Sequence, residues 1–267
     1  MRIIPVIDIL DGVVVRGVAG RRSEYRPIES CLTSATDPVS IALAFRELFG
    51  LATIYVADLD AIVSQRPNGQ VYQDLAARDF SVWVDAGLRS VDDAEAVLDC
   101  GASAVVAGLE TWPHAELLHQ LVLTCGRDRV IFSLDLRDGT PLADPDGWAS
   151  DDPFEIADEA ICAGVSQLIV LDIAHVGLGG GVATRELCRR LSESFPDVTL
   201  ITGGGVRDLD DVRQLESIGV AGVLVASALH SGAIDRRQIE NTLPTIQGGR
   251  SAMARLGASS PDSGKID

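Results

Sequence analysis

Residues 130–139, VIFSLDLRDG, have the pattern of a buried strand that ends in an acid and a tight turn. Five of the first seven residues are apolar, and β-branched or aromatic types are frequent among them, as is typical of a strand. The pattern predicts that Asp135 lies at the carboxyl end of this strand, just before a turn through Asp138 and Gly139.

The first twelve residues repeat this pattern. RIIPVIDILDG, residues 2–12, is an apolar run that contains Asp8 and ends in an Asp-Gly pair. Asp8 and Asp135 lie 127 positions apart, and the two Asp-Gly pairs have the same separation. A single acid after a strand is explained equally well as part of a turn. Two acids in matching contexts, half a chain apart, indicate a duplicated unit.

The repeat extends to other segments. GLRSVDDAEAVLDCG at 87–101 aligns without a gap with GVRDLDDVRQLESIG at 205–219, at an offset of 118. The sequence therefore predicts one domain at 1–245, built from two fused halves at about 1–125 and 126–245. The remainder, 246–267, is rich in Gly, Ser and Ala without sustained periodicity, which predicts a poorly ordered tail.

Strand-like runs alternate with amphipathic stretches along the whole domain. Helices are expected at 37–49, 92–100, 153–163 and 208–218, two of them starting with an Asp-Pro pair that is typical of a helix N-terminus. Eight alternating units in a chain of this length predict an α/β fold of the (β/α)8 TIM barrel type. A doubly wound open sheet is the alternative, but it gives no reason for the repeat. The expected strands lie near 3–8, 53–58, 81–86, 104–107, 130–135, 167–172, 198–202 and 222–226.

Composition narrows the function classes. The chain has 267 residues and a net charge of −17, which argues against nucleic acids and anionic membranes as partners. No long uncharged apolar run or signal-peptide pattern occurs, so we expect a cytoplasmic protein. Five scattered cysteines without a CxxC pair, and histidines without ligand spacing, predict neither disulfides nor a metal site. The oligomeric state cannot be read from these features.

Glycine-rich ends of strands predict phosphate sites. Gly204 and Gly205 follow the seventh expected strand and Ser227 follows the eighth, which is where barrels of this type usually bind phosphate. Glycines let the backbone approach the oxygens, and helix N-terminal amides donate to them. By the repeat, Gly87 and Gly108 mark a matching first-half site. Two such sites on one rim predict a substrate with a phosphate at each end, and plain flexible loops are the alternative.

Asp8 and Asp135 are expected between these phosphate sites, on opposite sides of the barrel mouth. Two carboxylates that face each other across a ligand suit paired general acid and general base catalysis. Four basic residues near the start of the chain predict a loop that steers an anion, or else ordinary surface charge; they are Arg16, Arg21, Arg22 and Arg26. His175, at the end of a strand, is interpreted as an exposed loop residue or a donor on the rim. It begins a glycine-rich stretch at 175–184 that we expect to form a mobile rim loop.

In combination, PVIDILDGVVVR, LDLRDG and GGGVRDLDD resemble the HisA/HisF family of histidine biosynthesis over about residues 1–235. The opening PVIDILDG is more similar to HisA, the phosphoribosylformimino-5-aminoimidazole carboxamide ribotide isomerase, than to the cyclase HisF. The resemblance implies a cofactor-free Amadori rearrangement of the bis-phosphorylated aminoaldose ProFAR to its aminoketose. It implies that Asp8 is the general base at C2 and Asp135 the general acid in ring opening.

The resemblance also assigns the phosphate ligands. It implies Gly87, Arg89 and Gly108 at one phosphate and Gly204, Gly205 and Ser227 at the other.

Three positions depart from the family pattern. Members usually carry a threonine at the end of the sixth strand and then an acid-glycine pair, where this chain has Leu171 and Val176-Gly177. Asp85 stands where the repeat has Gly203, and a carboxylate there repels phosphate. These departures are typical of a divergent HisA-like subgroup that acts on another phosphorylated metabolite, and some such relatives are associated with pterin-linked one-carbon metabolism. A barrel that binds a phosphorylated metabolite or pairs with an amidotransferase-like subunit, without catalysis, is the third reading.

Overall fold

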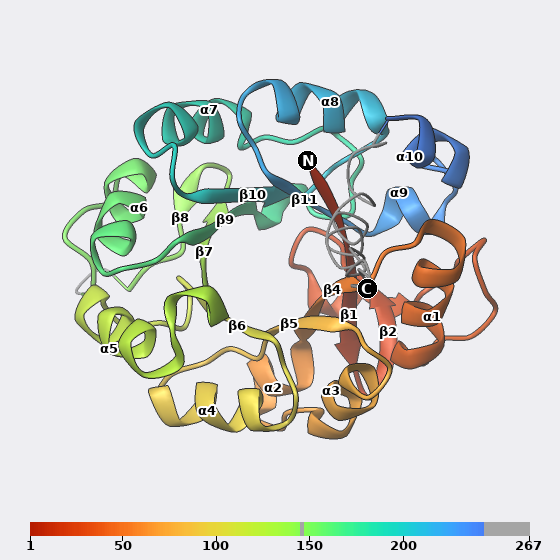
Figure 1. Cartoon of the computed structure of the whole chain (residues 1–267), viewed down its shortest axis with the longest axis horizontal. Helices are drawn as coiled ribbons and strands as arrows, with labels where there is room; N and C mark the ends of the chain where they lie inside the picture. The colour runs from red at the N-terminus through yellow and green to blue at the C-terminus, as the bar shows by residue number, and fades with distance from the viewer. Residues whose placement is uncertain (145–146, 243–267) are drawn as a thin grey trace, which may run out of the picture.

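Eight parallel strands form a closed barrel in the computed structural model, which describes residues 1–144 and 147–242. The barrel closes because the last strand pairs in parallel with the first, with Ile4 opposite Leu224. An open sheet would leave two edges, so the predicted (β/α)8 barrel is confirmed (Figure 1). The barrel strands, in chain order, are β1 (Arg2–Leu10), β4 (Thr53–Asp58), β5 (Ser81–Asp85), β6 (Ala104–Gly108), β7 (Val130–Arg137), β9 (Gln167–Asp172), β10 (Thr199–Gly203) and β11 (Gly222–Val225).

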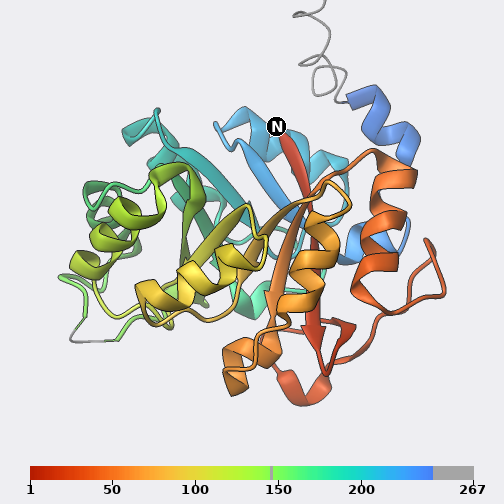
Figure 2. The ribbon, with the colours of Figure 1, turned by 60° about the horizontal axis from the view of Figure 1, so that its bottom comes forward.

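Helices surround the barrel on the outside (Figure 2). Both predicted Asp-Pro starts are confirmed, since the Asp37 side chain accepts a hydrogen bond from the Ser40 amide and Asp152 accepts one from the Phe154 amide. The helices are α1 (Pro38–Phe49), α2 (Leu59–Ser64), α3 (Gly69–Ala76), α4 (Val91–Asp99), α5 (Ala115–Cys125), α6 (Pro153–Cys162), α7 (Arg185–Ser194), α8 (Leu209–Ser217), α9 (Ser227–His230) and α10 (Arg236–Thr242). In the described part of the chain, no helix is long and apolar enough to span a membrane. The predicted tail at 246–267 lies outside the described residues.

The bounds of the elements follow the sequence repeat. Helix α8 begins and ends 118 positions after α4, and strand β10 begins and ends 118 positions after β5. Strands β4 and β9 have the same length, and β9 begins and ends 114 positions after β4. Two halves of the barrel therefore present equivalent backbone positions, and their functional differences reside in the side chains.

The short hairpins at the ends of β1 and β7 were expected only as turns. Strand β1 continues into β2 (Val13–Arg16) and β3 (Arg26–Pro27), and β7 turns back into β8 (Thr140–Pro141). Three short 3-10 helices lie between the longer elements of the described chain. They are η1 (Arg22–Glu24) between β2 and β3, η2 (Arg127–Arg129) before β7, and η3 (Ile173–His175) after β9. Alternation alone does not reveal such two- to four-residue strands, because they extend over too few residues to show a period.

Two acids hold these hairpin turns, Asp60 in the first turn of α2 and Asp172 at the end of β9. Asp60 accepts the amides of Asp11 and Gly12, at 2.9 and 3.4 Å. Asp172 accepts the corresponding amides of the second hairpin, Asp138 at 3.1 Å and Gly139 at 2.8 Å. The rim is therefore fixed by charge-assisted hydrogen bonds to backbone amides.

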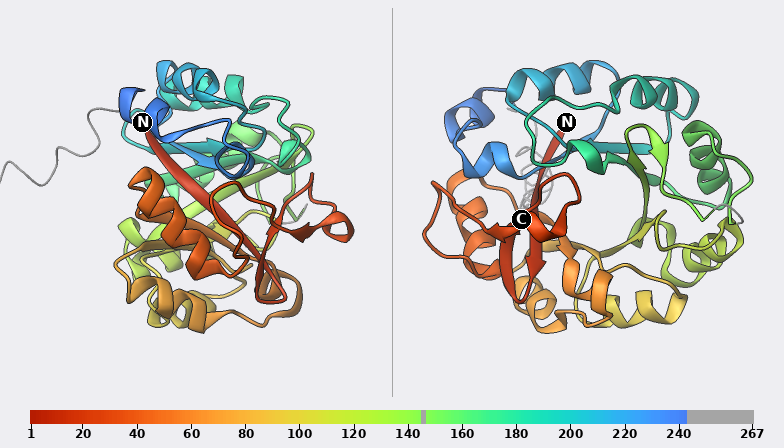
Figure 3. Two further views of the ribbon diagram at one scale, coloured as in Figure 1. Left: turned by 90° about the vertical axis from the view of Figure 1, so that its right-hand side faces the viewer. Right: turned by 180° about the vertical axis from the view of Figure 1, so that it is seen from behind.

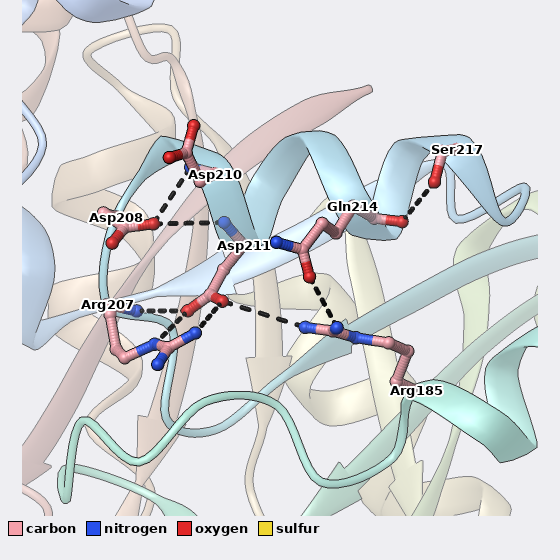
Figure 4. A network of polar contacts seen from close by, with 7 residues as sticks. All are labelled: Arg185, Arg207, Asp208, Asp210, Asp211, Gln214 and Ser217. Atoms are coloured by element: carbon pink, nitrogen blue, oxygen red, sulfur yellow. Dashed lines mark hydrogen bonds and ion pairs between the residues drawn. The ribbon is translucent and has the colours of Figure 1, made fainter.

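An ion-pair network joins α7 and α8 beneath the rim (Figure 4). The fully buried Asp211 carboxylate accepts the amide, Nε and Nη2 of Arg207, the last at 2.6 Å, and lies 3.8 Å from Arg185 Nη2. Hydrogen bonding to Arg207 holds the pKa of Asp211 below its ordinary range. The Arg207 guanidinium lies against Gly181, whose amide donates to the Gly205 carbonyl oxygen, so this network supports the loop after β10.

Asp211→Asn is expected to lower the free energy of unfolding by about 2 kcal/mol at neutral pH, because Arg207 loses a buried ionised partner but remains half exposed to water. The pKa of Asp211 is depressed, so this contribution is present above the ordinary value of 3.8 and is lost at lower pH. Urea denaturation measures it. Asp93→Asn is the matched control at the equivalent position of α4, where the exposed carboxylate accepts the Arg89 amide, and should cost less than about 1 kcal/mol. Equal losses in the two variants would contradict this account.

Candidate active site at the carboxyl ends of the strands

One cavity of about 280 Å3 lies at the end of the barrel where the strands finish. Asp8 on β1 and Asp135 on β7 both line it, so the structure brings these two residues together as predicted. The other charged side chains that line it are Asp85, Glu110, Arg22 and Arg137. The cavity occupies the place where (β/α)8 barrels carry their chemistry.

Asp8 is held against the loop that follows the first hairpin. The Gly17 amide donates to its carboxylate, and a Cβ at Gly17 would lie only 2.8 Å from Asp8 Oδ2. Glycine is therefore required for this approach. Burial raises the pKa of Asp8 to about 7, against the lowering effect of the Gly17 hydrogen bond, and the negative charge of Asp85 raises it further. Near neutral pH this carboxyl group exists in both protonation states.

Asp135 has a different environment. It is 8% exposed, and the Ser133 hydroxyl donates to its Oδ1 at 2.7 Å. Burial raises the pKa of Asp135 well above its ordinary value, and the nearby charge of Asp85 adds to the effect. Gly108 lies beside it, where an added Cβ would lie 3.0 Å from Asp135 Oδ2. This environment favours the protonated acid, so the two carboxyl groups are suited to different roles.

Asp85 is a third carboxyl group in the same cavity. Its Oδ1 accepts the Gly87 amide at 3.1 Å and its Oδ2 accepts the Tyr55 hydroxyl at 3.0 Å. Burial raises the pKa of Asp85 to about 6, with Glu110 as a further cause. Sequence reasoning identified Asp85 as a departure but missed Tyr55, because an aromatic residue within an apolar strand is ordinarily part of the core.

The opposite end of the cavity is formed mainly by backbone. Gly204 and Gly205 have φ of +79° and +87°, and Ser227 begins α9; all three line the cavity. A Cβ at Gly205 would lie 2.4 Å from the Gly181 carbonyl oxygen, so only glycine fits there. The first amides of a helix have no acceptor within the helix and are directed outwards. The structure thus places these residues where a phosphate site was predicted, and their role stays a prediction.

The first-half residues assigned to phosphate lie elsewhere. Gly87 and Arg89 line a separate depression beside α3 and α4. The Arg89 amide donates to Asp93, and its Nη2 lies 3.5 Å from the Ile62 carbonyl oxygen. Gly108 is buried next to Asp135 and is not among the residues that line the main cavity. Their assignment to a phosphate remains a prediction without a contact to this cavity.

The basic loop residues are divided between the cavity and its surroundings. Arg22 lines the cavity, and its Nη2 lies 3.8 Å from Glu110 Oε1. Arg16 donates to the Gly177 carbonyl oxygen at 3.1 Å and lines a smaller adjoining pocket that Asp8 shares. Arg21 pairs with Glu24 on the surface, and His175 ends η3; neither lines the cavity.

Two loops meet over the cavity. The segment after β1 and the glycine-rich segment after β9 lie next to each other when the barrel is viewed from the end where the strands finish (Figure 3, right). The Ala19 amide donates to the Val176 carbonyl oxygen at 2.8 Å, and a Cβ at Gly177 would lie 2.0 Å from the Gly17 carbonyl oxygen. The glycines of the predicted rim loop therefore allow it to pack closely against the first loop.

The fold and the cavity define the class of this protein as a (β/α)8 barrel with its site at the carboxyl ends of the strands. The family model described as "Histidine biosynthesis protein" matches residues 2–235, and the chain belongs to this family.

Its relatives match over almost their whole length. An uncharacterized protein of Methanocaldococcus jannaschii is 33% identical over 90% of this chain and 98% of its own. A protein of Halobacterium salinarum, named as the isomerase of 1-(5-phosphoribosyl)-5-((5-phosphoribosylamino)methylideneamino)imidazole-4-carboxamide, is 33% identical over 86% of this chain and 92% of its own. A protein of the same name in Methanosarcina barkeri is 30% identical over 92% of this chain and 98% of its own.

Proposed function

We propose that this protein is a HisA-like aldose–ketose isomerase that catalyses an Amadori-type rearrangement of a phosphorylated aminosugar. The observation that carries the proposal is the pair of carboxyl groups, Asp8 and Asp135, which line one cavity in environments that raise both pKa values. A general acid and a general base that work near neutral pH need such values. The names of the relatives supply the reaction class.

The two carboxyl groups divide the proton transfers. Protonated Asp135 gives its proton to the ring oxygen of the aminoaldose, which opens the ring and leaves a protonated imine at C1. Ionised Asp8 then removes the proton from C2, and the electron pair forms the enaminol. Tautomerisation to the ketone at C2, with a proton returned to C1, completes the aminoketose. No external oxidant is needed, because C2 is oxidised as C1 is reduced.

The phosphate end of the substrate is assigned to Gly204, Gly205 and Ser227, whose backbone lines the cavity beyond Asp8. Arg22 is the basic loop residue that reaches this cavity, and we assign it the attraction of the anionic substrate. Arg16, Arg21 and His175 stay outside the main cavity as substrate-loop candidates.

The test is isomerisation of ProFAR by the purified protein, followed by absorbance, together with complementation of a histidine auxotroph that lacks the isomerase. Turnover and growth would identify ProFAR as the substrate of this activity. A variant with both Asp8→Asn and Asp135→Asn is the control for growth caused by expression alone. Absence of turnover and of growth, despite soluble expression, would reject ProFAR as the substrate.

A second candidate is a paralogue that rearranges another phosphorylated metabolite with the same acids. The hydrogen bond from the Gly87 amide to Asp85 favours it, because this amide is then not available to a second phosphate. In that case the wild-type protein would not restore growth of the auxotroph. Asp8→Asn would still lower the activity on the substrate that the wild type turns over.

A further inference from the structure

The two ends of the cavity differ although the backbone repeats. At the second-half end, Gly204, Gly205 and Val206 and the residues Ala226 and Ser227 line the cavity. The positions 118 residues earlier are Ala86, Gly87, Leu88, Gly108 and Leu109; all of them are buried and none lines the cavity. The first-half residues that do line it are Asp85 and Glu110, which correspond to Gly203 and Ala228.

Asp85 fills the place that a phosphate would need. At Gly203 an added Cβ would lie 2.7 Å from Leu224 Cβ, so no side chain enters the cavity from that strand end. At the equivalent position Asp85 enters it, and its two oxygens accept the Gly87 amide and the Tyr55 hydroxyl. The donor that would hold a phosphate oxygen therefore already holds a carboxylate of this chain.

A second backbone amide at the first-half end, that of Leu109, also has a hydrogen-bond acceptor within the protein. Leu109, at the position equivalent to Ser227, donates its amide to the Ser133 carbonyl oxygen at 2.9 Å. Its side chain is 1% exposed and lies in the core. The exposed Glu110 follows directly and lines the cavity. A phosphate at this end would meet two carboxyl groups and lose both amide donors.

The charges around this end favour a ligand of the opposite sign. Asp85 and Glu110 are the carboxyl groups that line this end; Glu110 is paired with Arg22, whereas Asp85 accepts hydrogen bonds from two neutral donors, the Gly87 amide and the Tyr55 hydroxyl. Arg137 extends from the end of β7. Because burial raises the pKa of Asp85 only to about 6, this carboxyl group is largely ionised at pH 7.5. A bound cation would strengthen its ionised form.

We propose that the substrate carries a single phosphate, held at the Gly204–Ser227 end, and that its other end is a cationic amine or amidine held by Asp85. This inference rests on the proposed function, which places the substrate in this cavity. It replaces the bis-phosphorylated substrate of the resemblance with a monophosphorylated one. The carboxylate keeps the Tyr55 hydrogen bond when the cation binds, since each carboxylate oxygen has more than one acceptor position.

Binding of synthetic probes tests the proposal without turnover. Linear ω-aminoalkyl phosphates, from propyl to octyl, are compared by calorimetry at pH 7.5 with alkane bisphosphates and with plain alkyl phosphates of the same lengths. In the wild-type protein, the best aminoalkyl phosphate should bind at least about tenfold more tightly than the bisphosphate of equal length. Asp85→Gly, which restores the residue of the second half, should reduce this ratio at least about tenfold.

Asp85→Asn keeps the shape of the side chain and should also reduce the preference for the aminoalkyl phosphate over the bisphosphate. A folding defect of Asp85→Gly therefore does not decide the result. Equal or tighter binding of bisphosphates by the wild type, an unchanged ratio in both variants, or no binding of any aminoalkyl phosphate would overturn the proposal. Isomerase activity is measured separately. Amine-dependent binding without isomerisation of any phosphorylated aminosugar would reject the proposed function alone, and ProFAR turnover with a preference for bisphosphates would reject this inference alone.

Discussion

Asp8→Asn is expected to lower kcat/KM for the isomerisation by about 10²–10⁴, the usual contribution of a positioned general base. The amide has nearly the same shape and still accepts the Gly17 hydrogen bond, but it cannot remove the proton from C2. The loss should fall mainly on kcat, because Asp8 acts on a proton that moves only in the transition state. Steady-state kinetics with the aminoaldose that the wild type turns over measures it.

Asp11→Asn is the matched control for Asp8→Asn. Asp11 lies three residues later in the exposed turn, with φ of +51°, a conformation that asparagine tolerates, and it does not line the cavity. Its activity should stay within about twofold of the wild type, as for surface changes away from the site. If Asp8→Asn retained activity within about tenfold of the wild type, the assignment of Asp8 as the general base would be wrong.

The barrel was predictable because its signals are local and repeated. Apolar strands, Asp-Pro helix starts such as Asp37-Pro38, and glycines after helices each follow from backbone chemistry that a sequence displays directly. The repeat added long-range information that a single strand lacks. Segments 87–101 and 205–219 align without a gap, which predicts the same backbone path for both, and α4 and α8 have the same length at the same offset. The short hairpins were missed because strands of two to four residues carry no period.

The site was predictable only in part. Asp8 and Asp135 could be found because strand ends of a barrel converge on one rim, whatever lies between them in the chain. Tyr55 and the pairing of Arg22 with Glu110 could not, because both depend on how side chains from different strands are directed across the cavity. The first-half phosphate assignment assumed that equal backbones bind equal ligands, and the side chain of Asp85 separates the two ends.

The carboxyl groups that carry the proposed chemistry should also make the fold less stable as pH rises. The pKa of Asp8 is raised from 3.8 to about 7, so between these values the folded protein holds a proton that the unfolded chain has released. Stability from this group is therefore largest at low pH and is lost as pH rises through 7. At about 1.4 kcal/mol for each pH unit, the loss reaches at most about 4 kcal/mol.

Asp8→Asn is accordingly expected to be far less active and yet more stable than the wild type above pH 7. Urea denaturation between about pH 5.5 and pH 8.5 should give a free energy of unfolding that falls by about 2 kcal/mol more in the wild type than in the variant, because that share of the titration lies in this window. Asp11→Asn, whose carboxylate is exposed, should follow the wild-type curve. Parallel curves for the wild type and Asp8→Asn would show that Asp8 is ionised throughout this range and would contradict a pKa raised to about 7 by burial.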